Sequence, residues 1–179
     1  MTMMAMTDRS GAATNSATDP GGGSQSLTGS GPITVNAVTL ALVEQVRDLS
    51  GNWLADNASI PIGGQIYFVF TVDNITPAKA IDLKIANALN EADFIYVPNS
   101  IETTTVPTGS NDAALWAATW IAATDAVGVP DDIASIVDTG GGAGLDRVTL
   151  GMVSGQSNQQ VDLPGNTMQA IRFKVTVKK

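Results

Sequence analysis

The stretch GGQIYFVFTVDN, residues 63–74, decides the fold class of this chain. Its large apolar residues recur at every second position from Ile66 to Val72, which is the period of a β-strand rather than of a helix. The Gly-Gly pair before this run and the Asp-Asn pair after it are residues typical of turns. The stretch therefore predicts a strand with one face packed into a hydrophobic core.

The same alternation recurs on both sides of this strand. Further strands are expected at 38–46, 80–89, 147–153 and 170–177, with a short apolar run at 94–97 and an edge strand at 103–106. No strand alternates with a helical pattern in the manner of a parallel α/β fold. These features together predict an all-β chain, an Ig-like antiparallel β-sandwich of about seven strands.

Residues 111–123 break the strand pattern. Asn111-Asp112 suits the start of a helix, and Trp116 and Trp120 would share a helical face because they are four positions apart. They would share a strand face equally well, since four is also an even spacing. We expect a short helix or an irregular crossover here, with a strand as the alternative. Residues 125–146 are acidic and rich in glycine, and are expected to form a long loop.

Residues 1–32 form a distinct segment of small and polar residues. GGGS occurs at 21–24, GSGP at 29–32, and beyond the first methionines Leu27 is the main large apolar residue. Such a composition buries too little surface to offset its ordering entropy. Two interpretations remain open: a flexible tail or linker, or an extended donor strand laid across a neighbouring subunit. The predicted organisation is therefore an N-terminal tail or donor-strand segment at 1–32 and one sandwich at 33–179.

Composition excludes several functional classes. The net charge of −8 repels phosphate backbones, so nucleic acid is not expected as a partner. No apolar run approaches the roughly 20 residues that a membrane-spanning helix needs. The first residues show neither the basic region nor the sustained apolar region of a signal peptide.

The chain contains no cysteine and no histidine. It therefore lacks disulfides, thiolate zinc sites, cysteine nucleophiles and the usual general base near neutral pH. A Ser–His–Asp arrangement is impossible for the same reason. We expect that the protein is not an enzyme, and the sequence predicts no catalytic or cofactor-binding residue.

The acidic loop supplies the one candidate metal site. Carboxylate oxygens and the carbonyl groups of glycine-rich loops are ligands that Ca²⁺ prefers. The spacing matches no EF-hand, and aspartate in loops usually stabilises turns, so both interpretations stay open. The candidate calcium ligands are Asp125, Asp131, Asp132, Asp138 and Asp146.

Three tryptophans are candidates for carbohydrate binding. Trp53, Trp116 and Trp120 would form a stacking platform if their rings were exposed. The alternative is core packing, which the small apolar neighbours of the last two favour. Calcium and carbohydrate are thus the only small ligands that the sequence suggests.

The order of several motifs resembles a known family. IPIGGQIYFVFTVDN at 60–74, YVPNSI at 96–101, LPG at 163–165 and the alternating strand at 171–177 resemble the conserved-repeat Ig-like domain of bacterial and archaeal surface proteins, domain of unknown function family eleven. The resemblance covers about 36–179. It departs from the family at Gly64, where the family usually has aspartate, and at 89–92, which replaces Asp-x-Leu-Pro.

The resemblance implies an extracellular or cell-surface sandwich that serves as a spacer, an adhesin segment or an assembly subunit, without catalytic residues. With the separate N-terminal segment, it suggests a structural subunit of a filament or surface assembly. Head-to-tail strand addition between identical copies would build such a homopolymer. The alternative is a carbohydrate- or ligand-binding adhesin module.

Overall fold

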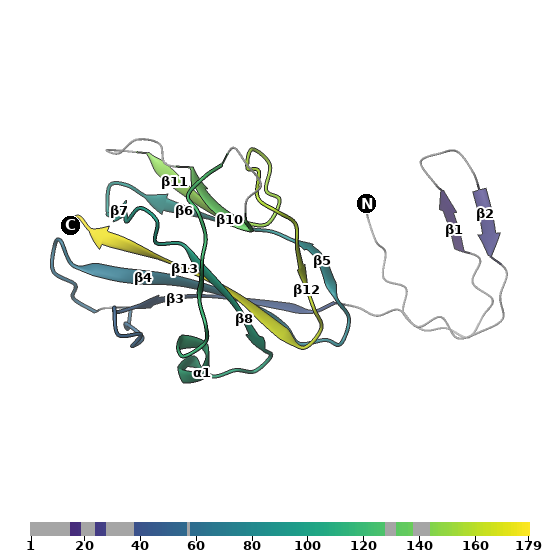
Figure 1. Ribbon diagram of the computed structural model, residues 1–179, viewed down its shortest axis with the longest axis horizontal. Helices are drawn as coiled ribbons and strands as arrows, with labels where there is room; N and C mark the ends of the chain where they lie inside the picture. The colour runs from purple at the N-terminus through teal and green to yellow at the C-terminus, as the bar shows by residue number, and fades with distance from the viewer. Residues whose placement is uncertain (1–14, 19–23, 28–37, 57, 128–131, 138–143) are drawn as a thin grey trace. The chain divides into compact units, whose positions relative to one another are not determined.

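The computed structural model describes residues 15–18, 24–27, 38–56, 58–127, 132–137 and 144–179. The chain divides into two units, Met1–Val35 and Asn36–Lys179. In the first unit, strands β1 (Asn15–Thr18) and β2 (Ser24–Leu27) pair antiparallel in a sheet of their own. The second unit is an all-β sandwich with one short helix, which confirms the predicted fold class (Figure 1).

One layer of the sandwich is a large antiparallel sheet. Its strands lie in the order β3-β4-β13-β8-β9, and β7 pairs with β13 beside β8. Their bounds are β3 (Leu40–Arg47), β4 (Gln65–Asn74), β7 (Phe94–Tyr96), β8 (Glu102–Pro107), β9 (Ile121–Ala122) and β13 (Thr167–Val177). The predicted strand at 63–74 is thus confirmed as β4, next to the centre of the sheet.

The second layer consists of two smaller antiparallel sheets. One has the order β10-β11-β6 and the other pairs β12 with β5 (Figure 1). Their bounds are β5 (Ala80–Leu83), β6 (Ile85–Asn90), β10 (Ala134–Val137), β11 (Leu145–Leu150) and β12 (Val161–Leu163). The hydrophobic core contains buried residues from both layers.

Phe173 on β13 lies at the centre of this core and is fully buried. Its ring is stacked on those of Phe68 and Phe70, with centroids 5.7 and 6.0 Å apart. The register of β4 and β13 places Phe68 directly opposite Phe173, so the alternation in the two sequences meets on one face. Aromatic pairs at these separations add to the stability gained from burial alone.

The break at residues 111–123 contains the expected helix, α1 (Asp112–Trp116). Asn111 caps it, because its side-chain oxygen accepts a hydrogen bond from the Ala114 N–H at 2.9 Å. The helix ends at Trp116, so Trp120 lies beyond its last turn. The helix interpretation is therefore confirmed, but the two tryptophans do not share a helical face.

The prediction of one continuous strand at 80–89 is wrong. The segment divides into β5 and β6, which belong to different sheets. Asp82, within β5, has a φ of 59°, a left-handed conformation that is foreign to a regular strand. This kink ends the alternation, so Leu83 is buried whereas Ile81 is 71% exposed.

Two other expectations about strands are also corrected. Residues 103–106 do not form an edge strand, because β8 lies between β13 and β9 in the large sheet. The acidic segment 125–146 is not a continuous loop, since it contains β10 and the start of β11. Ala134–Val137 is only four residues long, too short for alternation to reveal it from the sequence.

Candidate functional site

The outer strand of the large sheet, β3, has one open side (Figure 1). It pairs with β4 over eight residues, Leu40–Arg47, and within the described part of the chain no other strand forms a ladder with it. Among the described residues, its one further strand-like contact is an isolated bridge from Arg47 to Trp53. We call the unpaired side of Leu40–Gln45 the β3 edge.

The direction of the backbone groups on β3 follows from the end of the strand. The Val46 carbonyl accepts a hydrogen bond from the Leu54 N–H at 2.9 Å, so the Val46 backbone points away from β4. Backbone direction alternates along an antiparallel pair. The N–H and C=O groups of Leu40, Leu42 and Glu44 therefore also point outward. The β3 edge thus presents three donors and three acceptors to an incoming strand.

The side chains of the β3 edge are apolar and exposed. Leu40, Leu42 and Val43 are 43%, 64% and 46% exposed, and Glu44 is the one charged residue between Leu40 and Gln45. Natural sheets usually protect their edges with lysine, proline, bulges or short strands. Apart from the single charge of Glu44, the β3 edge has none of these protections, so it is suited to pairing with another strand. The low charge of 38–46 was the sequence feature that could have indicated this edge.

Two other outer strands of the sandwich, β9 and β5, are less suited to pairing. β9, at the opposite side of the same sheet, contains only two residues, Ile121–Ala122. On β5 the left-handed Asp82 interrupts the strand and forms an ion pair with Lys84 at 2.7 Å. Charged side chains and irregular backbone are the usual means of preventing pairing. The β3 edge is longer than β9 and, unlike β5, contains no left-handed residue.

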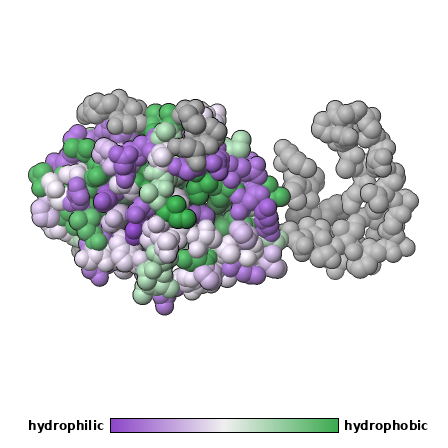
Figure 2. Space-filling model, in the orientation of Figure 1, coloured by the Kyte–Doolittle hydropathy of each residue, from purple (hydrophilic) through white to green (hydrophobic). Residues whose placement is uncertain are grey.

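A groove opens where β3 ends. It has a volume of about 660 Å³, and its lining includes the side chains of Val46, Trp53, Ile60, Ile66, Phe94 and Val177. Trp53 is 63% exposed at this groove. Elsewhere, apolar residues are scattered among polar ones over the face of the sandwich shown in Figure 2. Its lining also includes the polar residues Glu44, Gln45, Asp56 and Lys179, and we call this hollow the β3 groove.

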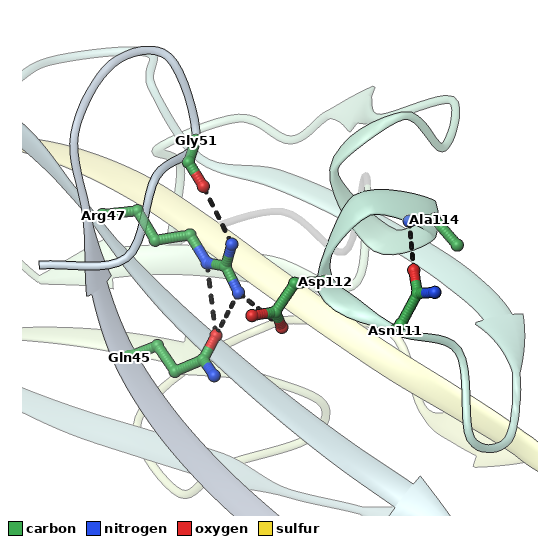
Figure 3. A network of polar contacts seen from close by, with 6 residues as sticks. All are labelled: Gln45, Arg47, Gly51, Asn111, Asp112 and Ala114. Carbon is green, nitrogen blue, oxygen red and sulfur yellow. Dashed lines mark hydrogen bonds and ion pairs between the residues drawn. The ribbon is translucent and has the colours of Figure 1, made fainter.

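A buried arginine fixes the end of β3 (Figure 3). Arg47 is only 2% exposed, and its Nη1 donates to the Gly51 carbonyl at 2.8 Å. Its Nη2 lies 2.7 Å from a carboxylate oxygen of Asp112, and its Nε donates to the Gln45 side chain. One side chain thus joins β3, the turn after it and the start of α1. The network holds the strand end in place and leaves the β3 edge accessible.

Among the candidate calcium ligands, Asp125 has a structural role. One carboxylate oxygen accepts from the Tyr96 hydroxyl at 2.6 Å and the other from the Asn99 N–H at 2.9 Å. Burial of the ring, together with the bond to Asp125, raises the pKa of Tyr96 above its ordinary value. The carboxylate thus anchors the turn after β7.

Asp132 is used in a similar way. Its two oxygens accept hydrogen bonds from the Thr124 and Ala134 N–H groups at 2.6 and 2.9 Å. Asp146 is buried on β11, while Asp131 and Asp138 lie outside the described residues. Within the described ranges, no group of three or more acidic side chains is placed to hold a metal ion. A calcium site remains a prediction.

The three tryptophans do not form one platform. The Arg172 guanidinium lies 4.0 Å from the Trp120 ring centroid and 4.5 Å from that of Trp116, and both tryptophans are half-buried. Arg172 also forms an ion pair with Glu102 at 2.7 Å. These contacts are cation–π packing on the outer face of the large sheet. Only Trp53 presents a largely exposed ring.

The fold and the site together define an all-β sandwich with an open edge strand beside a groove of mixed polar and apolar lining. Among the described residues, no helix is long and apolar enough to cross a membrane. Comparison with protein-family models, with curated proteins and with solved structures finds no match to this chain. The resemblance to the Ig-like repeat of surface proteins remains a prediction.

Proposed function

We propose that this protein is a structural subunit of an extracellular or cell-surface assembly, without catalytic activity, that polymerises by strand addition. The observation that carries this proposal is the β3 edge, with its outward backbone groups and exposed leucines. Strand addition uses main-chain hydrogen bonds for affinity and side-chain pockets for specificity. The β3 edge supplies the main-chain hydrogen-bonding groups, and the β3 groove supplies the side-chain pocket.

The energetics favour an incoming strand that uses both features. Pairing all the outward groups of Leu40, Leu42 and Glu44 would form six hydrogen bonds, and a four-residue strand would form about four of them, each contributing about 1 kcal/mol. Association costs an estimated 4–15 kcal/mol, so hydrogen bonds alone give a weak joint. Covering Leu40 and Leu42 and filling the groove adds the hydrophobic contribution of roughly 25 cal/mol per Å². The incoming strand therefore needs at least one large apolar side chain.

The proposed donor is the N-terminal segment, residues 1–32. Its described strands, Asn15–Thr18 and Ser24–Leu27, contain four residues each and pair with each other. A two-stranded hairpin alone is at best marginally stable in water, so these strands gain by joining a larger sheet. Donation from each copy to the next is a head-to-tail contact, and such contacts build filaments when they do not close into rings.

Deletion of residues 1–32 tests this proposal. The truncated protein is expected to keep the β-type circular dichroism of the full chain and to stay monomeric, whereas the full chain forms polymers visible by electron microscopy. A matched control carries the same residues 1–32 in scrambled order, which keeps composition and length. Polymers of unchanged appearance from the truncated protein would contradict the proposal.

A binding module is the second candidate, and the exposure of Trp53 at the β3 groove favours it. An exposed indole beside a groove is suited to stacking on a sugar ring. A carbohydrate binder is expected to stay monomeric and to lose tryptophan fluorescence on adding sugars. Replacing Trp53 with alanine would abolish that quenching, whereas replacing the half-buried Trp116 would not.

A further inference from the structure

We infer that the β3 edge accepts strand Ser24–Leu27 of a second copy of this chain, with the Leu27 side chain seated in the β3 groove. This inference rests on the proposed function and specifies both halves of its joint. Its first support is length. Outward backbone groups are open from Leu40 to Glu44, while the Val46 carbonyl is already bonded to Leu54. A short strand fits this stretch, and Ser24–Leu27 has four residues.

The second support is the position of the apolar residue. Leu27 is the only large apolar residue between Thr7 and Pro32. The β3 groove has a polar part, which includes Asp56 and Lys179, and an apolar part, which includes Phe94; a leucine gains by burial against the apolar part, whereas the serines and glutamine that precede it do not. None of the residues in Ser24–Leu27 is charged, so the donor meets no repulsion from Glu44.

The third support is direction. The β3 groove lies at the C-terminal end of β3, and Leu27 is the C-terminal residue of its strand. Seating Leu27 there places the donor parallel to β3. A parallel neighbour from the same chain needs a crossover connection of about a dozen or more residues, usually a helix. The connection 28–39 contains Gly-Ser-Gly-Pro and meets only that minimum. Donation from a second copy removes this constraint.

Introduced cysteines test the joint, because the natural chain has none. In the inferred arrangement Gln25 shares a face with Leu27, and that face meets Leu42 and Glu44. We expect Gln25→Cys combined with Leu42→Cys or Glu44→Cys to give a ladder of covalent trimers and longer species on non-reducing gels. Each single-cysteine variant can form at most covalent dimers. Combining Gln25→Cys with Ile121→Cys, on the opposite edge of the sheet, should give no ladder.

Two further variants test the contacts without cross-linking. Leu42→Pro removes an outward N–H but no hydrogen bond to β4, and should weaken polymerisation about tenfold while the sandwich stays folded. Leu27→Ser should weaken it by about tenfold or more, because the groove loses its apolar occupant. Ile75→Ser is the matched control, since Ile75 is 55% exposed and is not among the groove residues. Polymerisation that survives Leu27→Ser and Leu42→Pro unchanged would overturn the inference.

The outcomes separate this inference from the proposed function. A ladder through Ile121, or polymers with no link from Gln25 to the β3 edge, would overturn the inference and leave the proposed function standing. Monomers closed by an internal disulfide would show that the segment pairs with its own β3 edge, which overturns the second copy as donor. An unmodified chain that forms no polymers at all would overturn both.

Discussion

Replacing Asp125 with alanine separates a structural carboxylate from a calcium ligand. The substitution removes the acceptor of the buried Tyr96 hydroxyl, a charge-assisted bond that contributes about 1.5 kcal/mol, and of the exposed Asn99 N–H, which contributes about 0.5 kcal/mol. The expected loss is therefore about 2 kcal/mol in the free energy of unfolding. In a domain of this size, that lowers the Tm by about 4–8 °C.

Urea unfolding followed by tryptophan fluorescence measures this loss, with Ca²⁺ and with EDTA. The structural role predicts the same loss in both conditions, because neither hydrogen bond involves a metal. Tyr96→Phe is the matched control, since it removes only the hydroxyl bond and should cost about 1.5 kcal/mol. Two results would refute this reasoning: a loss below about 0.5 kcal/mol, or a stabilisation of the natural chain by Ca²⁺ that the variant lacks.

Three other substitutions probe the sandwich. Phe173→Ala should cost about 3–5 kcal/mol, because it empties a fully buried position between stacked rings; a smaller loss in urea unfolding would argue against this core. Gly151→Ala should lower the Tm, since Gly151 has a φ of 78° and a Cβ there would lie 2.0 Å from the Leu83 carbonyl oxygen; an unchanged Tm would refute that close approach. Hydrogen bonds, the largest from Lys79, lower the pKa of Asp162 to about 2. That carboxylate therefore stabilises the fold above the ordinary carboxyl pKa and loses its effect as the pH falls toward about 2. Asp162→Asn should flatten the acid side of the stability curve, and an unchanged acid side would contradict the pKa shift.

The parts of the fold that were predictable are those governed by local patterns. The alternation of large apolar residues around Phe68 identified β4, because these residues recur at every second position, which is the period of a strand. Asn111 identified the start of α1, because a cap is defined by a side chain and the backbone three residues later. In both cases the residues that decide the structure lie next to each other in the chain.

The parts that were not predictable depend on contacts between distant residues. Alternation shows which residues share a face, but not whether another strand covers that face, so the exposure of Leu42 was not predictable. The kink at Asp82 is accompanied by a hydrogen bond from its N–H to Asp162, eighty positions away. The role of Asp125 depends on Tyr96, twenty-nine positions away. No local spacing indicates either contact.

Hydrogen exchange at single residues tests the availability of the β3 edge most directly. The full chain is measured at concentrations where polymers are present and where they are absent, and the N–H groups of Leu42 and Glu44 are followed. Those of Ala41 and Val43, which point toward β4, serve as internal controls. Strand addition predicts that Leu42 and Glu44 exchange fast in the monomer and slowly in the polymer, with the controls slow in both. Equally fast exchange of Leu42 and Glu44 in the polymer would contradict the account.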